Sequence, residues 1–238
     1  MTYTNSQLVD YTRISPYRGS RNGHVIDTIT IHCAAAQAAV ETLGSLFQTK
    51  QASANYGIGP DGRVGMYVEE KNRSWATSDG ENDGRAVTIE VACENRHPYR
   101  VNDAAYKTLL DLVTDICRRN GIKKLVWSTS KADRVNHKNG CNMTVHRDYE
   151  NKACPGQWLY ERHGQIAAEV NKRLTEDEEM VRWNKIEDVP EGYREMAQRY
   201  IDVGALKGKG NGEIDLSEDM IRVMEIMRRY FESMMEGK

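Results

Sequence analysis

The pattern of hydrophobic and polar positions divides the first 175 residues into short strands and longer helices. Four runs have β-type character and three segments carry apolar residues at helical spacing. The predicted strands are 27–34, 87–93, 123–130 and 142–148. The predicted helices are 38–50, 102–121 and 157–174. This alternation predicts an α/β domain over residues 1–175, with a mixed central β-sheet flanked by helices.

Residues 176–238 follow a different pattern, which predicts a small C-terminal helical module. The acidic stretch TEDEEM, 175–180, is a candidate joint between the two parts. One helix is predicted after 188–192, KGKGNG at 207–212 ends it, and a second helix begins at Ser217. The apolar side of the first helix is expected to bury Tyr193, Met196, Ala197, Tyr200 and Ile201. The stripe expected on the second comprises Met220, Ile221, Met224, Met227 and Tyr230.

Alternation along three of the predicted strands places ionisable side chains on one face of the sheet. Successive side chains of a strand point to opposite faces of the sheet. His32 therefore points to the other face from Ile31, and Glu90 to the other face from Ile89. His146 has the same position in the strand expected at 142–148. If these strands are neighbours, His32, Glu90 and His146 converge on an open face, while the apolar faces are buried beneath helices.

A cysteine follows the last of these histidines and completes a set of metal donors. In TVHRDYENKACPG, 144–156, Cys154 comes eight positions after His146, with Lys152 between them. Two histidines and one cysteine supply the nitrogen and sulfur donors that zinc prefers, and three protein ligands leave a fourth position for water. Cys141 would close the site as a structural one, but CNMTVH lacks a tight chelating spacing. We therefore expect a catalytic zinc site, although each residue alone also fits a structural role.

Composition and charge exclude several other classes of protein. The 33 basic and 35 acidic side chains nearly cancel, so no nucleic-acid partner is expected. No apolar run reaches the roughly 20 residues of a membrane span, so no membrane insertion is expected. The first residues lack the apolar core of a signal peptide, so we expect synthesis in the cytoplasm without one. Five cysteines, an odd number in a chain of this length, are expected to be reduced thiols.

Four segments resemble a known family in the order in which they occur. They are ITIHCAA, ASANYGIGPDGRVG, RAVTIEVA and VHRDYENKACPG. Over about residues 20–175 they look like the zinc-dependent N-acetylmuramoyl-L-alanine amidases of the phage-lysozyme type, or type-2 amidases, which are related to peptidoglycan recognition proteins. The resemblance implies zinc bound by His32, His146 and Cys154, with Lys152 polarising the scissile carbonyl. It also implies a phage or prophage endolysin that acts on the cell wall after release, cutting peptidoglycan between N-acetylmuramic acid and L-alanine.

The general base differs between branches of that family. One branch has a catalytic tyrosine two positions before the residue that is Tyr56 here, and this chain has Ala54 there. Another branch has a glutamate in a strand reading IGIE, and VTIE places Glu90 in that position. Glu90 is therefore expected to be the base, and Tyr56 to line the groove or lie in the core. The alternative is a non-catalytic peptidoglycan-binding protein of the same fold, but such proteins commonly lack the cysteine ligand.

Three further features of the sequence each allow two interpretations. The stripe of the C-terminal module is too large for so small a unit to bury, so it is expected to contact another surface. A methionine-rich stripe suits protein contacts, which favours a homodimer, with wall binding as the alternative. Trp75 is expected either to stack on substrate or to pack at the rim of the core. His137 is either a substrate contact or a solvated loop residue.

Overall fold

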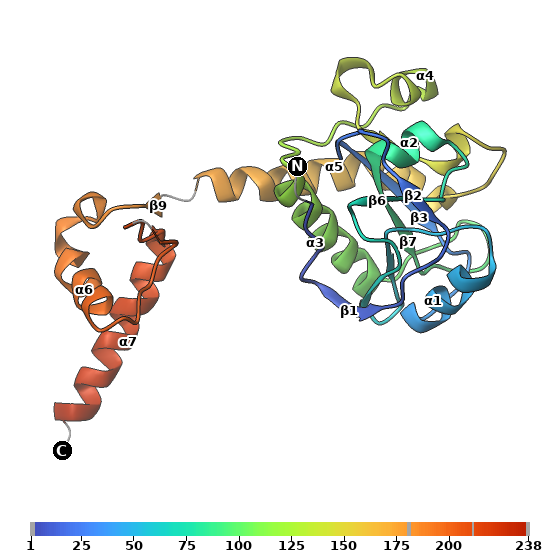
Figure 1. The fold of residues 1–238 in the computed structure, drawn as a ribbon. Coiled ribbons are helices and arrows are strands. Elements are labelled where there is room, and N and C mark those ends of the chain that lie inside the picture. Colours follow the sequence, from blue (N-terminus) through green and yellow to red (C-terminus); the bar gives the residue numbers. More distant parts are fainter. Residues whose placement is uncertain (1–2, 180–181, 211, 237–238) are drawn as a thin grey trace. The chain divides into compact units, whose positions relative to one another are not determined.

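The chain forms two compact units in a computed structural model (Figure 1). The structure describes residues 3–179, 182–210 and 212–236. The first unit ends at Leu174 and the second begins at Thr175. Among the described residues, no helix combines the length and the apolar character that crossing a membrane requires.

A six-stranded mixed sheet forms the centre of the first unit. In sheet order its strands are β1 (Val9–Thr12), β5 (Val64–Met66), β4 (Tyr56–Ile58), β7 (Ala86–Val91), β3 (Thr28–Cys33) and β8 (Met143–Thr144). Strands β4 and β5 are antiparallel, and all other neighbours are parallel. A separate antiparallel pair joins β2 (Arg18–Ser20) to β6 (Asn72–Ser74). The mixed α/β fold expected from the sequence is confirmed.

Helices connect and flank the strands of this unit. They are α1 (Val40–Thr49), α2 (Gly80–Arg85), α3 (Asp103–Asn120), α4 (Lys131–Val135) and α5 (Gly156–Glu179), with 3-10 turns η1 (Lys138–Gly140) and η2 (His146–Asp148). Helix α3 begins where its cap was expected, because the Asn102 side chain accepts a hydrogen bond from the Ala105 amide. It ends at Gly121, whose φ of 70° is the left-handed conformation that glycine adopts without strain.

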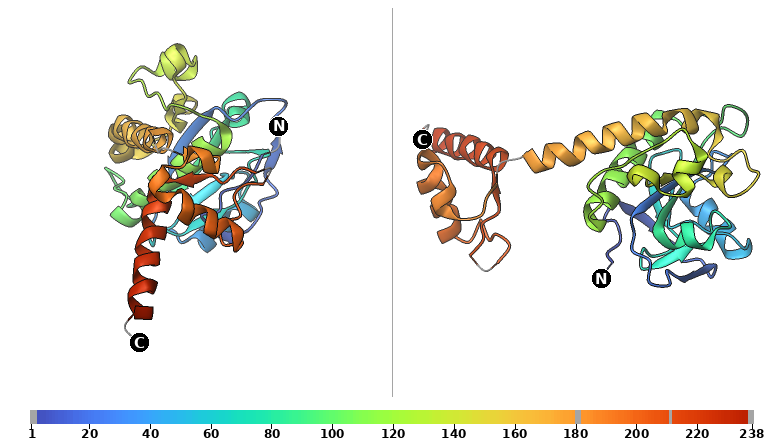
Figure 2. Two further views of the ribbon diagram at one scale, coloured as in Figure 1. Left: turned by 90° about the vertical axis from the view of Figure 1, so that its left-hand side faces the viewer. Right: turned by 90° about the horizontal axis from the view of Figure 1, so that it is seen from above.

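The helices cover both faces of the sheet. Ile29 and Ile89 are fully buried in one core cluster with Leu109 of α3 and Ile166 of α5. On the opposite face, a side chain at Gly57 of β4 would lie 2.9 Å from Leu43 of α1, so this helix packs there directly against the strand backbone. Figures 1 and 2 show α3 and α1 on opposite sides of the sheet.

Two predicted strands differ from the structure. Residues 123–130 form no strand in this described part of the chain, because side-chain amides take the place of a neighbouring strand: the Leu125 amide donates to Asn171 Oδ1 and the Val126 amide to Asn142 Oδ1. The strand expected at 142–148 is only Met143–Thr144 long, and the chain then turns into η2. His146 therefore follows a strand and does not lie on one.

The second unit contains the two predicted helices and a small sheet that was not predicted. Helices α6 (Glu191–Asp202) and α7 (Glu218–Glu236) accompany the turn η3 (Ile186–Asp188) and the antiparallel strands β9 (Arg182–Trp183) and β10 (Leu216–Ser217). Its core comprises Val189, Met196, Ala197, Ile214, Leu216 and Ile221. Tyr193, expected to be buried, is exposed.

The start of α7 and the end of α5 bear on two predictions made from the sequence. Ser217 caps α7, since its hydroxyl accepts the Met220 amide hydrogen at 3.2 Å. The acidic stretch proposed as a joint is helical as far as Glu179, because α5 continues through it. Met180 lies outside the described residues.

Candidate active site

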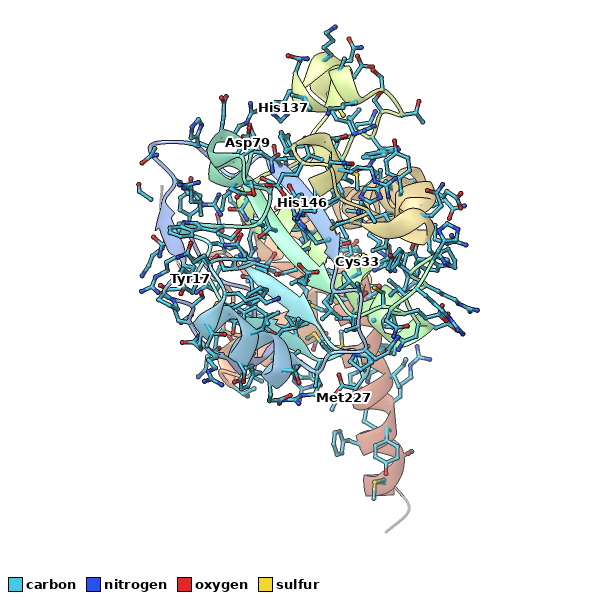
Figure 3. All side chains as sticks on the ribbon, turned by 90° about the vertical axis from the view of Figure 1, so that its right-hand side faces the viewer. Tyr17, Cys33, Asp79, His137, His146 and Met227 are labelled. Carbon is cyan, nitrogen blue, oxygen red and sulfur yellow. The ribbon has the colours of Figure 1, made fainter. Side chains whose placement is uncertain are left out.

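The order of the strands brings the predicted site residues to one end of the sheet. Strands β3 and β7 are parallel neighbours, and His32 lies directly opposite Glu90. On its other side β3 pairs with β8, where Thr30 faces Thr144, and His146 follows two residues later. Figure 3 shows His146 over the sheet, near the end of β3 that Cys33 marks. The convergence expected from strand alternation is present.

His32, His146 and Cys154 form a compact group of donor atoms. One ligand atom from each lies within 4.8 Å of the other two, and these are the residues of the described chain that could hold a metal ion together. The two imidazole rings are 5.1 Å apart, and Cys154 Sγ lies 3.4 Å from His32 Nδ1. Cys141, the candidate fourth ligand, is buried elsewhere, with its sulfur 4.0 Å from the Met143 carbonyl oxygen.

The donor group fits a metal ion because two of its buried nitrogen atoms lack partners. Nε2 of His32 and Nε2 of His146 accept and donate no hydrogen bond, although Glu150 Oε2 lies 3.4 Å from the latter. Leaving a buried polar atom unsatisfied costs about 1–3 kcal/mol, a cost that a bound cation would remove. Burial lowers the pKa of His32, which favours the neutral ring that a metal requires. Two imidazoles and one thiol form a donor set typical of zinc.

Glu90 lies beside this group, on the central strand β7. Burial raises the pKa of its carboxyl group, and the nearby His32 and His146 oppose that rise. Glu90 therefore lies within electrostatic reach of both histidines of the donor group.

A cavity of about 670 Å³ adjoins the segment between His146 and Cys154. It is lined by His97, Tyr99, Lys131, Arg147, Tyr149, Glu150, Asn151, Lys152, Ala153 and Gln157. The Lys152 side chain is 55% exposed, and its ammonium group lies 3.7 Å from Glu150 Oε2. The volume is typical of small-ligand pockets, and the charged lining favours a polar ligand. The sequence pattern singled out Lys152 but not the other charged residues of this wall.

A buried ion pair that the sequence did not reveal supports the turn carrying His146. Arg134 of α4 donates two hydrogen bonds to Asp148, at 2.7 and 2.6 Å, and both side chains are almost fully buried. The guanidinium also lies 4.5 Å from the centre of the Trp127 ring. Because Asp148 belongs to η2, this pair fixes the turn in which His146 lies.

A network of polar side chains fills the sheet face next to the donor group. The hydroxyls of Thr30 and Thr144 are 2.7 Å apart, and Asn82 Oδ1 accepts hydrogen bonds from Thr144 and Tyr149 at 2.8 and 2.9 Å. Asn82 is held in α2, whose first turn is capped by Asp79 (Figure 3). The network ties β3, which carries His32, to β8, which precedes His146. Alternation placed both threonines on this face.

The other residues singled out in the sequence lie apart from the donor group. Tyr56 is fully buried in the core, and its hydroxyl donates to Glu70 at 2.7 Å. Trp75 is 40% exposed and lies 5.7 Å from the Tyr17 ring. His137 lies next to α4, away from His146, with its Nδ1 3.0 Å from the Cys141 carbonyl oxygen (Figure 3).

The first unit thus combines a mixed-sheet fold with a candidate metal site. Residues 22–157 match the Amidase_2 family, described as N-acetylmuramoyl-L-alanine amidase. The match covers more than half of the chain, and the protein therefore belongs to this family.

A solved structure supports the fold. A selenomethionine derivative of AmpD is 17% identical, with a TM-score of 0.51, over 70% of this chain and 99% of that one. The endolysin amidase LysCS from Clostridium intestinale is 18% identical, with a TM-score of 0.49, over 68% of this chain and 93% of that one. No curated protein sequence matches this chain significantly.

Proposed function

We propose that this protein is a zinc-dependent amidase that hydrolyses the bond between N-acetylmuramic acid and L-alanine in peptidoglycan. The observation that carries the proposal is the donor group of His32, His146 and Cys154, with its unpartnered ring nitrogens, beside Glu90. Membership of the amidase family supports the same reaction. The proposed setting is that of an endolysin that acts on the bacterial cell wall.

The proposed chemistry divides between the bound metal and the residues of this chain. Zinc, when held by the three donors, acts as a Lewis acid and lowers the pKa of a bound water from about 15.7 towards about 7. Glu90 accepts the proton of the attacking water and delivers one to the departing amine of L-alanine. Its place directly opposite His32 on the neighbouring strand supports this role.

Lys152 has the role of an electrostatic stabiliser in this proposal. As the attacked amide carbon becomes tetrahedral, negative charge develops on its oxygen, and an ammonium group near that oxygen stabilises the charge. Lys152 is a candidate because it lines the cavity beside the donor group and keeps its side chain half exposed. Glu150, 3.7 Å away, holds the ammonium group on the wall of the cavity while it is not engaged.

The second candidate is a peptidoglycan-binding protein of the same fold that does not cut its ligand. Binding alone needs neither the metal donors nor a buried carboxylate beside them. In this chain Cys154 completes the donor group, and Glu90 lies opposite His32. Both observations favour the enzyme.

The experiment that tests the proposal identifies the bond that is cut. Purified walls are digested with the full chain, new amino groups are labelled, and the released fragments are analysed by mass spectrometry. We expect new L-alanine amino termini and no new reducing sugar ends. Cys154→Ser should release nothing, whereas Cys141→Ser, the matched change at the buried thiol outside the donor group, should retain activity. Labelled D-amino acid termini or new reducing ends would assign a different bond, and intact walls with the wild-type protein would favour the binding protein.

A further inference from the structure

Helix α7 has an apolar face that its own unit does not cover. Seven large apolar side chains on it are between 41% and 66% exposed. They are Met220, Val223, Ile226, Met227, Tyr230, Phe231 and Met234. Five of the seven, at 220, 223, 227, 230 and 234, recur at alternating steps of three and four residues. This is the a and d spacing of a coiled-coil seam, and we call these seven side chains the α7 stripe.

The core of the second unit uses a different edge of the same helix. Ile221 is 1% exposed and packs with Leu216 and Ala197, while Met224 is partly buried against that cluster. The stripe expected from the sequence included Ile221 and Met224, so its membership is corrected here. Beyond Met227, Phe231 still lines a pocket with α6, whereas Tyr230 and Met234 are 59% and 55% exposed. Figures 1 and 2 show the end of α7 at the edge of this unit.

The opposite face of α7 is charged and pairs its charges within the helix. Arg222 contacts Glu218 at 2.5 Å, and Arg229 contacts Glu225 at 2.7 Å. Arg228 lies between Glu225 and Glu232, at 2.8 and 2.6 Å. These i,i+3 and i,i+4 pairs balance most of the charge of this face within the helix itself. The charged face therefore needs no further partner, whereas the stripe remains to be covered.

We propose that the α7 stripe pairs with the α7 stripe of a second copy of this chain, in a two-helix coiled coil. A twofold contact requires a self-complementary surface, and an apolar seam with a regular heptad step has that property. At the observed exposures the seven side chains present on the order of 800 Å² together, about what each partner contributes to a standard interface. Isolated monomers rarely expose so large a contiguous apolar patch.

The charges of α7 favour a second copy over a membrane surface. A helix that lies on an anionic membrane is rich in lysine and arginine on its polar face. Over its length α7 carries three basic residues, Arg222, Arg228 and Arg229, against five acidic ones, Glu218, Asp219, Glu225, Glu232 and Glu236. Pairing with a second copy requires no positive charge. The inference does not depend on the proposed amidase reaction.

The test compares two double variants that change the net charge equally on opposite faces of α7. Val223→Glu with Tyr230→Glu places two charges in the stripe. Arg222→Gln with Arg229→Gln removes two charges from the other face, where exposed ion pairs contribute little to stability. Each variant lowers the net charge by two, and glutamate and glutamine are similar helix formers. Full-length proteins are compared by light scattering and sedimentation equilibrium from about 1 to 100 μM, a span that brackets a micromolar dissociation constant.

We expect the wild type and the arginine variant to reach twice the chain mass of 27.1 kDa with rising concentration. The stripe variant should remain at the single-chain mass, with a dissociation constant raised at least about a hundredfold, because each charge would be buried unpaired in the seam. Circular dichroism checks that its helices are retained; if they are lost, Met234→Glu, near the end of α7, replaces the double change. A wild type that stays monomeric throughout overturns the proposal. Monomers that pellet with walls would assign the stripe to the wall, and monomers that bind anionic lipid vesicles would assign it to a membrane.

Discussion

The donor group at the end of the sheet and the α7 stripe both lack interaction partners, but the missing partners are of different kinds. At the sheet, buried ring nitrogens of His32 and His146 lack hydrogen-bond partners. On α7, side chains such as Val223 and Ile226 lack apolar cover. The first deficit is electrostatic and local, so a single cation can satisfy it. The second extends along several helical turns, so only another macromolecular surface is large enough.

The two regions also differ in how they are supported. The donor group depends on residues distant in sequence, from β3, from the turn after β8 and from the segment before α5, and on the buried pair of Arg134 and Asp148. The α7 stripe lies on one continuous helix and needs only its periodicity. Changes to the buried pair that supports the donor group should therefore affect folding and catalysis together, whereas changes to exposed residues of the stripe should affect association alone.

Metal removal should have the largest effect and should separate the two regions. Treatment with a chelator should reduce clearing of purified walls to the level of buffer alone, since His32, His146 and Cys154 would then hold no Lewis acid. Adding zinc back should restore clearing. The mass measured by light scattering should be unchanged throughout, because the stripe contains no donor. Full clearing by a sample shown to be metal-free by elemental analysis would exclude the zinc mechanism.

Breaking the buried ion pair should have the next largest effect. Asp148→Asn leaves Arg134 as a buried charge without its carboxylate, which should lower the free energy of unfolding by about 3–5 kcal/mol. The matched change Asp111→Asn weakens exposed ion pairs with Arg173 and Lys107 and should cost at most about 1 kcal/mol. Urea unfolding followed by circular dichroism measures both. Equal losses for the two variants would show that the buried pair does not support the fold.

Substitution of the proposed base should affect the rate and leave the fold intact. Glu90→Gln should retain zinc and lower the rate about a hundredfold or more, the usual contribution of a general base. Tyr56→Phe should leave the rate per folded molecule nearly unchanged, although losing the hydrogen bond to the buried Glu70 should cost about 1–3 kcal/mol of stability. Rates are measured well below the melting temperature of each variant. A larger rate loss for Tyr56→Phe than for Glu90→Gln would show that Glu90 is not the general base.

The smallest expected effect is a difference in stability when the same substitution is made at two isoleucines of α7. Ile221→Val removes a methylene from the core of the second unit and should cost about 0.5–1.5 kcal/mol. Ile226→Val makes the same change at a side chain that is 66% exposed, and should alter stability by less than about 0.5 kcal/mol. Thermal unfolding is measured at a concentration where the chain is monomeric. A loss at Ile226 as large as that at Ile221 would mean that the stripe is already covered within one chain.

Much of the fold and of the candidate site followed from local sequence patterns. The strands at β3 and β7 and the helix over 102–121 were all predicted, because each depends on side-chain alternation or on backbone preferences within a few residues. The same alternation placed His32 and Glu90 on one face. The strand expected at 123–130 was wrong, because the side chains of Asn142 and Asn171 satisfy backbone groups that a strand would pair.

What the sequence determined by itself was the direction of each side chain from its own backbone and the chemical identity of the donors. The tertiary structure decided which strands are neighbours, and the order β7, β3, β8 is what brings Glu90, His32 and His146 together. It also decided that Arg134 reaches Asp148, and that Ile221 of α7 is buried while Ile226 is exposed. Periodicity gives the apolar faces of an element, but only packing against other elements determines which of them is covered, because burial is a property of pairs of surfaces.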